Sequence, residues 1–185
     1  LSFIVSVSQV LGTLSLQSAA VKYIAQYRAQ GEIEKAKAVA VRILQIGVLA
    51  SAVTFSVLFV PAEWLSTLLF STADLAILIR LLAINSIFTI LEINASGILQ
   101  GLQRMGTVAI LTLMMSLTST FTGIILLVSG LRLYAPVIGW SAGWCSTAVI
   151  GLFLVFKYLG ISGKPHPLRP LLSFSWPLYV SAIIG

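Results

Sequence analysis

The chain has 185 residues, of which 58% are hydrophobic and 9% are charged, with eleven Lys and Arg against five Asp and Glu. Soluble domains carry about 25% charged residues, so this composition argues against a water-soluble enzyme, a soluble nucleic-acid-binding domain and a disordered chain. In a membrane protein a net charge of +6 reflects basic cytoplasmic loops and does not indicate a nucleic-acid partner. The single cysteine, Cys145, excludes an internal disulfide and a cysteine metal cluster. We expect no metal site and no cofactor.

Uncharged stretches predict the membrane spans. A bilayer core of ~30 Å needs about 20 helical residues, and these runs are too long and too little alternating for barrel strands. We therefore predict an all-α, polytopic transmembrane helical bundle with five complete spans and the start of a sixth. The chain begins and ends inside apolar runs, so we interpret it as a fragment of a longer protein. The five runs cover residues 1–21, 43–62, 81–103 (with one charge, Glu92), 105–131 and 133–156, and the sixth starts within 170–185.

Turn signals separate these spans. Gly31 is expected to end the first helix, and Gly130 with Pro136 to bracket a later turn. Ser71 and Asp74 have the spacing of a capping box before the third span. Gly106 is expected to mark a tight turn between the third and fourth spans.

The distribution of Lys and Arg predicts the orientation. Nine of these residues fall in the first, third and fifth connections, against two in the others. By the positive-inside rule, residues 22–42, 104–106 and 157–170 are cytoplasmic and residues 63–80 lie outside. The first span then runs from outside to inside, so we expect at least one earlier span in the intact protein.

Polar residues form a stripe on the first span, where they recur at steps of three or four and fall within about 80° of one face. Such a stripe should face protein or water rather than lipid. Hydrogen bonding between helices by Ser and Thr is one explanation, but two glutamines on the same face favour a hydrated cavity. The stripe consists of Ser2, Ser6, Gln9, Thr13 and Gln17.

The third span carries a second stripe with an acid near its middle. A carboxylate there costs ~3 kcal/mol on insertion scales, so it must be protonated, paired or beside water. Glu92 is accordingly either a site for ion coupling or substrate hydrogen bonding, or a packing residue paired with a neighbouring helix. We expect Gln9, Gln17, Asn85 and Glu92 to line a common cavity. The stripe consists of Asn85, Thr89, Glu92, Ser96, Gln100 and Gln103.

Two pairs of glycines predict close helix packing. Gly97 and Gly101 form a small-xxx-small pair on another face of the third span, and Gly139 and Gly143 do the same in the fifth. The second pair also matches G-x-S-x-G, but a hydrolase elbow needs a strand-to-helix turn and a nearby histidine, and the only histidine is His166. Asn94-Ala95-Ser96 fits the glycosylation pattern but lies inside a span. We therefore expect no catalytic residues.

Three segments carry a resemblance to a known family. Ala95–Gly106 resembles the end of the fourth span of Wzx-like polysaccharide flippases, a branch of the multidrug/oligosaccharidyl-lipid/polysaccharide exporter superfamily. Ala20–Arg28, with Gly31 and Glu34-Lys35, resembles the cytoplasmic end of their second span. Leu171–Leu178 resembles the opening of their seventh span. The three segments occur in the expected order and the resemblance covers essentially the whole chain.

The resemblance implies a transporter that flips lipid-linked oligosaccharides across the cytoplasmic membrane by alternating access. It implies that residues 1–158 hold about spans two to six of a first lobe, that 159–169 are a cytoplasmic linker, and that 170–185 begin a second lobe. The implied partners are the bilayer, a lipid-linked sugar and the rest of the same chain. Cationic side chains at cytoplasmic ends would meet a lipid diphosphate, with ordinary positive-inside anchoring as the alternative. These cations are Lys22, Arg28 and Arg104.

Other functions stay open at this point. A multidrug or organic-cation exporter of the same superfamily would also use an intramembrane acid, so Glu92 does not separate the two. A membrane-embedded lipid-linked glycosyltransferase would need clustered acids, and the five acids here are scattered. A non-transporting scaffold would not need the polar stripes.

Overall fold

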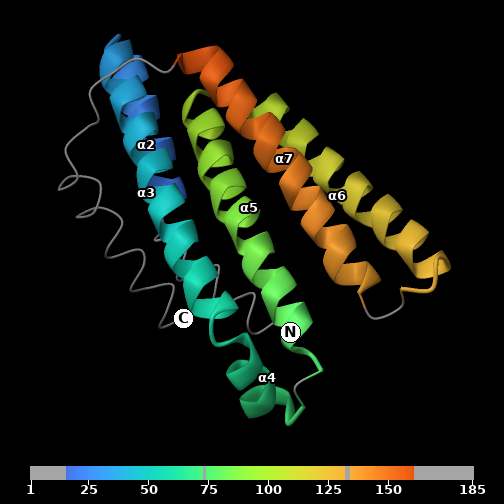
Figure 1. Cartoon of the computed structure of the whole chain (residues 1–185). Helices are drawn as coiled ribbons and strands as arrows, with labels where there is room; N and C mark the ends of the chain where they lie inside the picture. The colour runs from blue at the N-terminus through green and yellow to red at the C-terminus, as the bar shows by residue number, and fades with distance from the viewer. Residues whose placement is uncertain (1–15, 73, 132–133, 161–185) are drawn as a thin grey trace.

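The computed structural model describes residues 16–72, 74–131 and 134–160, which form an all-α arrangement without strands in those ranges (Figure 1). Four of the helices are long and apolar enough to cross a membrane, namely α3, α5, α6 and α7. This confirms the predicted helical membrane fold. Most of the first predicted span, and all of 170–185, lie outside the described residues. The helices are α2 (Leu16–Ala29), α3 (Ile33–Phe59), α4 (Ala62–Phe70), α5 (Ala76–Gly101), α6 (Met105–Val128) and α7 (Ala135–Leu159).

Helix α3 begins ten residues before the uncharged run that predicted it. Its first turns carry two exposed ion pairs, Lys35 to Glu32 at 2.8 Å and Lys37 to Glu34 at 2.7 Å. Such pairs three residues apart stabilise a helix in water, so the helix extends past the apolar segment. The first residue of the uncharged run therefore marks where α3 passes from water into its apolar segment. It does not mark the first residue of the helix.

Backbone conformation confirms some expected helix ends and corrects others. Gly31 and Gly130 have positive φ values of 76° and 91° and lie just beyond α2 and α6, as predicted. Ser71, however, is the left-handed residue that ends α4, and α5 begins after Leu75 without a side-chain cap, so the capping-box prediction was wrong. The turn before α6 uses Gln103, with φ of 58°, whereas Gly106 lies inside that helix.

Helix α4 was not predicted, because residues 63–80 were assigned to a loop. It packs through buried Ala62 against Ile79 at the start of α5. The carboxylate of Glu63 accepts a hydrogen bond from Arg80 at 2.8 Å. Helix α4 has only nine residues and follows the apolar run of α3 directly, so its short periodic pattern was not separated from that run.

Helix α5 lies at the centre of the described bundle, with α2, α3 and α7 packed around it (Figure 1). Sixteen of its residues are buried, more than in any other described helix. The main core joins all four helices and sits toward the end where α2 meets α3. It includes Leu16, Ala20 and Ile24 of α2, Val39 and Ile43 of α3, Ile98 and Leu99 of α5, and Val155 of α7.

The glycines of α5 allow α2 to approach its backbone closely. A Cβ atom on Gly101 would lie 2.9 Å from the carbonyl oxygen of Ala20, and one on Gly97 would lie 3.1 Å from that of Gln17. A Cβ atom on Gly97 would also lie 2.8 Å from Cγ of Gln17, so at both positions a larger residue would force α2 or its side chains to shift. The predicted small-xxx-small contact is confirmed.

The second glycine pair joins α7 to α6. A Cβ atom on Gly139 would lie 2.8 Å from the carbonyl oxygen of Ser119, and one on Gly143 would lie 2.8 Å from that of Met115. Apart from this contact α6 is largely exposed, and Leu111 is its one buried residue in the described part of the chain. Helices α6 and α7 therefore form a hairpin that touches the rest of the bundle mainly through α7.

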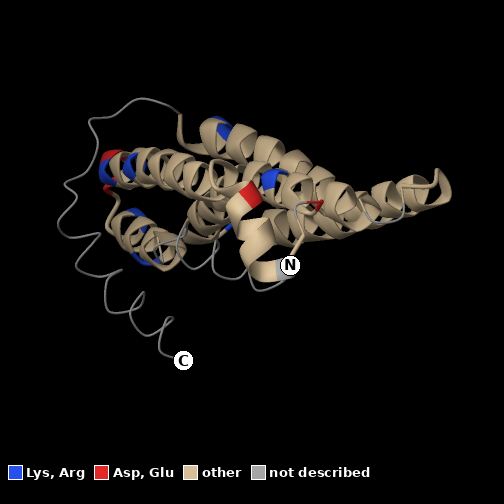
Figure 2. Ribbon diagram, turned by 60° about the horizontal axis from the view of Figure 1, so that its bottom comes forward, with Lys and Arg blue, Asp and Glu red and all other residues tan. Residues whose placement is uncertain are grey.

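The described connections divide between two ends of the bundle. The α2–α3 turn, the α5–α6 turn and the end of α7 lie at one end, and α4 and the α6–α7 turn lie at the other (Figure 1). Long stretches of helix between these ends carry no charged residue (Figure 2). The described parts of the segments assigned to the cytoplasm, up to residue 160, thus share one end of the bundle, and the chain crosses a membrane several times.

We predict that this shared end faces the cytoplasm. In a Cys145→Ser background, a cysteine at Lys35 should react with a membrane-impermeant maleimide only in opened cells, because α3 carries its basic first turns there. A cysteine at Thr67, an exposed position on α4, should react in intact cells. Labelling of position 35 but not 67 in intact cells would reverse the orientation.

Candidate functional site

The polar stripe of α5 comprises Asn85, Thr89, Glu92, Ser96 and Gln100, whereas Gln103 lies in the turn beyond the helix. Asn85, Thr89 and Ser96 are buried, and Glu92 and Gln100 are half-buried. The Thr89 hydroxyl donates to the carbonyl oxygen of Asn85 at 3.1 Å and lies 3.4 Å from the Asn85 side-chain nitrogen, which donates to it. The hydroxyl of Thr89 and the side-chain nitrogen of Asn85 thus have hydrogen-bond partners one turn away on the same helix. The Asn85 side-chain oxygen is buried without a partner among the described residues.

Glu92 lies near the middle of α5 and is held by its neighbour one turn on. The Ser96 hydroxyl donates to Glu92 Oε1 at 2.6 Å, within the short range typical of bonds to a carboxylate. No Lys or Arg in the described part of the chain forms an ion pair with Glu92. The carboxylate is therefore oriented by a hydroxyl but not neutralised by a described cation.

Helix α2 brings Gln17 against α5. The side chain and backbone of Gln17 contact Gly97, the residue that follows Ser96. Gln17, the one residue of the first predicted stripe that the structure describes, therefore packs on the glycine face of α5, about 100° around the helix from Ser96. Gln9 lies outside the described residues, so a common water-filled face for Gln9, Gln17, Asn85 and Glu92 stays a prediction.

The three cations predicted at cytoplasmic ends have different surroundings. Arg28 donates from Nη1 to the carbonyl oxygen of Leu102, just past the C-terminus of α5. A cation at this point stabilises the exposed carbonyls and the dipole of α5. The Arg104 guanidinium lies 4.7 Å from the ring centroid of Tyr158, and the Lys22 ammonium lies 5.4 Å from that of Tyr23. All three residues are exposed, but only Arg28 is bound to the end of another helix, whereas Arg104 and Lys22 lie near tyrosine rings.

Asn94 is a buried polar residue that the sequence reading did not select. Its side chain is fully buried, and neither its oxygen nor its nitrogen has a hydrogen-bond partner among the described residues. It faces α3, where a Cβ atom on Gly47 would lie 2.5 Å from its side-chain nitrogen. Asn94 lies on a different face of α5 from the polar stripe. Only knowledge that α3 packs against α5 could have identified it as a buried polar residue.

A comparison with known families decides what kind of protein this is. The sequence model of the polysaccharide biosynthesis protein family matches residues 3–185. The chain belongs to this family. No curated protein and no solved structure matches it significantly.

Membership confirms the resemblance found in the three sequence segments and covers every helix described above. The chain is thus a multi-pass membrane protein of the polysaccharide biosynthesis family.

Proposed function

We propose that this member of the polysaccharide biosynthesis family is a flippase, which moves lipid-linked oligosaccharide or polysaccharide precursors across the cytoplasmic membrane by alternating access. The observation that carries the proposal is a family match over a bundle whose central helix holds a polar stripe within a membrane span. Such groups inside a membrane are costly and therefore mark substrate or ion pathways. Family members are transporters rather than enzymes, which supports the absence of a catalytic role.

The polar stripe of α5 has the chemistry to bind a sugar. Hydroxyl and carboxamide groups both donate and accept hydrogen bonds, and a carboxylate accepts two or more from neighbouring sugar hydroxyls. Glu92, with Ser96 fixing one of its oxygens, would be the strongest acceptor, and Gln17 from α2 would add an amide. In this proposal Asn85, Thr89, Ser96 and Gln100 complete the binding face, together with Gln9.

Glu92 has a second use in the same proposal. A carboxylate without a described cation partner takes up a proton or Na⁺ when the surrounding helices exclude water. Release of that ion on the opposite side of the membrane would couple flipping to an ion gradient. Sugar binding and ion coupling both require the carboxylate.

Cations at the cytoplasmic end would receive the lipid diphosphate. Arg104 precedes the first turn of α6, where backbone N–H groups also favour anions. Lys22 is exposed on α2, and Arg28 is held by Leu102. Of the three, Arg104 combines exposure with a helix N-terminus, so we assign it the main phosphate contact.

The proposal also assigns the parts of the chain. Residues 1–158 would form the first lobe, 159–169 the cytoplasmic linker and 170–185 the start of the second lobe. Alternating access then needs the rest of the same chain as a partner, because the substrate passes between two lobes.

A multidrug or organic-cation exporter is the second candidate, favoured by the absence of a described ion pair at Glu92. An organic cation would supply the missing positive charge. The bundle and its stripe would serve either substrate.

Depletion of the protein in its own cells tests the proposal. If the protein is a flippase, its depletion should cause lipid-linked sugar to accumulate on the cytoplasmic leaflet and surface polysaccharide to fall. Efflux of ethidium should stay normal. Lipid-linked sugar is measured by extraction and mass spectrometry. As a control, glycosyltransferase activity in the same membranes should be unchanged, which shows that synthesis of the lipid-linked sugar is intact. Loss of ethidium efflux with normal lipid-linked sugar would instead identify the exporter.

A further inference from the structure

Two buried polar atoms, one on α7 and one on α5, lack hydrogen-bond partners among the described residues. Trp144 is a half-buried residue near the middle of α7, and its indole nitrogen Nε1 is one of these atoms. The other is the side-chain oxygen Oδ1 of Asn85, a residue of α5 that is 3% exposed. Buried polar atoms nearly always have a partner, so both atoms require an explanation.

Two contacts determine how α7 lies along α5, its neighbour in the bundle (Figure 1). Val137 lies in one core cluster with Leu82, near the start of α5. A Cβ atom on Gly151 would lie 3.4 Å from Cβ of Ala95, farther along α5. The two helices are therefore parallel. Trp144 is seven residues, or nearly two full turns, from each contact on α7, so it shares the face that packs on α5.

This register places Trp144 against the segment of α5 between the two contacts. Asn85, Thr89 and Glu92 of the polar stripe belong to that segment. Asn85 is three residues after Leu82 and lies within about 60° of its direction. Long side chains on a helix lean toward its N-terminus, so the indole of Trp144 leans toward the Asn85 end of the segment. The two atoms without partners therefore line the same part of the contact between α5 and α7.

The chemistry of the two atoms indicates what group fits between them. Trp144 Nε1 is a donor only and Asn85 Oδ1 is an acceptor, yet they do not bond to each other. A group that serves both must accept from the N–H and donate to the oxygen, which a hydroxyl does. The hydroxyl of Ser119 also has no described partner, but it lies against Gly143, about 100° around α7 from Trp144. Ser119 therefore faces a different side of α7.

We propose that Trp144 and Asn85 form a sugar subsite, in which one hydroxyl of the lipid-linked oligosaccharide accepts from Trp144 Nε1 and donates to Asn85 Oδ1. This subsite rests on the flippase function proposed above and adds α7 to a site built so far from α5 and α2. The indole also presents an apolar ring to the C–H face of the same sugar. A water molecule has the same donor and acceptor chemistry, so the test has to distinguish the two.

The first test measures binding to the full chain purified in detergent. Its two probes are the lipid-linked oligosaccharide extracted from the protein's own cells and the same lipid diphosphate with its sugars removed. Trp144→Phe keeps an aromatic ring but removes the N–H, so it should weaken binding of the first probe about 2- to 10-fold and leave the second unchanged. Trp140→Phe is the matched control, because it makes the same change one turn earlier on α7, where the indole nitrogen is not a buried atom without a partner.

The possible outcomes separate the subsite from the function on which it rests. If Trp144→Phe binds the oligosaccharide as tightly as Trp140→Phe does, the subsite is overturned and the flippase function stands. A lower thermal unfolding midpoint of Trp144→Phe with unchanged oligosaccharide affinity would show that a structural water joins the two groups, which also overturns the subsite. A wild-type protein that binds neither probe would contradict the flippase function, and the subsite with it.

A second measurement stands even if Trp144→Phe fails to fold. Replacement of Trp144 by 3-benzothienylalanine keeps both fused rings and exchanges only the N–H for sulfur. It should cause the same selective loss of oligosaccharide affinity. In an Asn85→Ala background the replacement should have a smaller effect, because a hydroxyl that bonds to both groups couples them. Fully additive effects of the two changes would mean that the groups share no ligand, and would overturn the proposal.

Discussion

Glu92→Gln is expected to lower polysaccharide export about 10- to 100-fold while the amount of protein in the membrane stays normal. Hydrogen bonds to a charged group contribute about 1.5–3 kcal/mol, and each 1.4 kcal/mol is a factor of ten. The amide keeps the shape of the side chain and still accepts from Ser96, which donates to Glu92 at 2.6 Å. Export is measured as surface polysaccharide in cells that carry only the variant.

Glu63→Gln is the matched control for this change. Glu63 lies on exposed α4 and pairs with Arg80, and exposed pairs contribute ~0–1 kcal/mol, so export should not change. Ser96→Ala should cause a smaller loss than Glu92→Gln, because it frees the carboxylate without removing it. Full export by Glu92→Gln would make the residue incidental to transport. Degradation of Glu92→Gln would show that the residue serves packing.

Gly139→Ala with Gly143→Ala is expected to destabilise the protein by about 1–3 kcal/mol for each overpacked methyl group. The added Cβ atoms would lie 2.8 Å from carbonyl oxygens of Ser119 and Met115, and a backbone oxygen cannot rotate away. Helix α6 would have to separate from α7, its main partner. The measurement is the thermal unfolding midpoint of the purified protein in detergent.

Gly106→Ala provides the control for the glycine variants. It also replaces a helical glycine, but a Cβ atom there meets nothing within 4 Å. Alanine has the higher helix propensity, by about 1 kcal/mol, so this variant should be as stable as wild type or more so. If the double variant had the same thermal unfolding midpoint as Gly106→Ala, the contact of α6 with α7 would not depend on the absence of side chains at Gly139 and Gly143.

The fold could be predicted where a single physical requirement controls the sequence. Hydrocarbon excludes charge, so uncharged runs located the spans that became α3, α5, α6 and α7. Close backbone approach requires glycine, so Gly97 and Gly139 identified two helix contacts. The start of α3 and the existence of α4 were missed because helices also form in water, where uncharged runs give no signal. Gln103 was missed because its positive φ is imposed by the α5–α6 turn rather than by its residue type.

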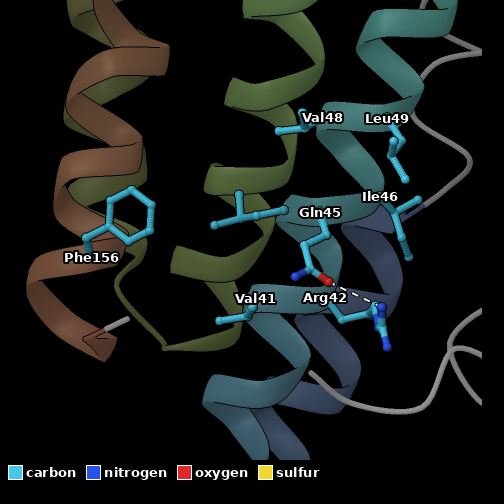
Figure 3. A pocket seen from close by; sticks show the side chains of 8 residues that line it. Val41, Arg42, Gln45, Ile46, Val48, Leu49 and Phe156 are labelled. Atoms are coloured by element: carbon cyan, nitrogen blue, oxygen red, sulfur yellow. Dashed lines mark hydrogen bonds between the residues drawn. The ribbon is translucent and has the colours of Figure 1, made fainter. Parts of the chain in front are cut away.

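The candidate site was predicted only in part. Helical periodicity was sufficient to place Asn85, Thr89 and Ser96 on one face of α5. Periodicity within one helix says nothing of which helix lies opposite, so the contact of Asn94 with Gly47 was not foreseen. A pocket lined by seven residues of α3 and by Phe156 of α7 (Figure 3) was not foreseen for the same reason.

The tie between Arg28 and Leu102 has a consequence for biosynthesis. These residues are 74 positions apart, so α2 is made well before the helix end that it caps. At about 5–20 residues per second, roughly 4–15 s pass before α5 is complete. Throughout that interval the surface of α2 that will receive Gly97 and Gly101 has no α5 to cover it. The pairing of α2 with α5 therefore has to wait until α3 and α4 have been made.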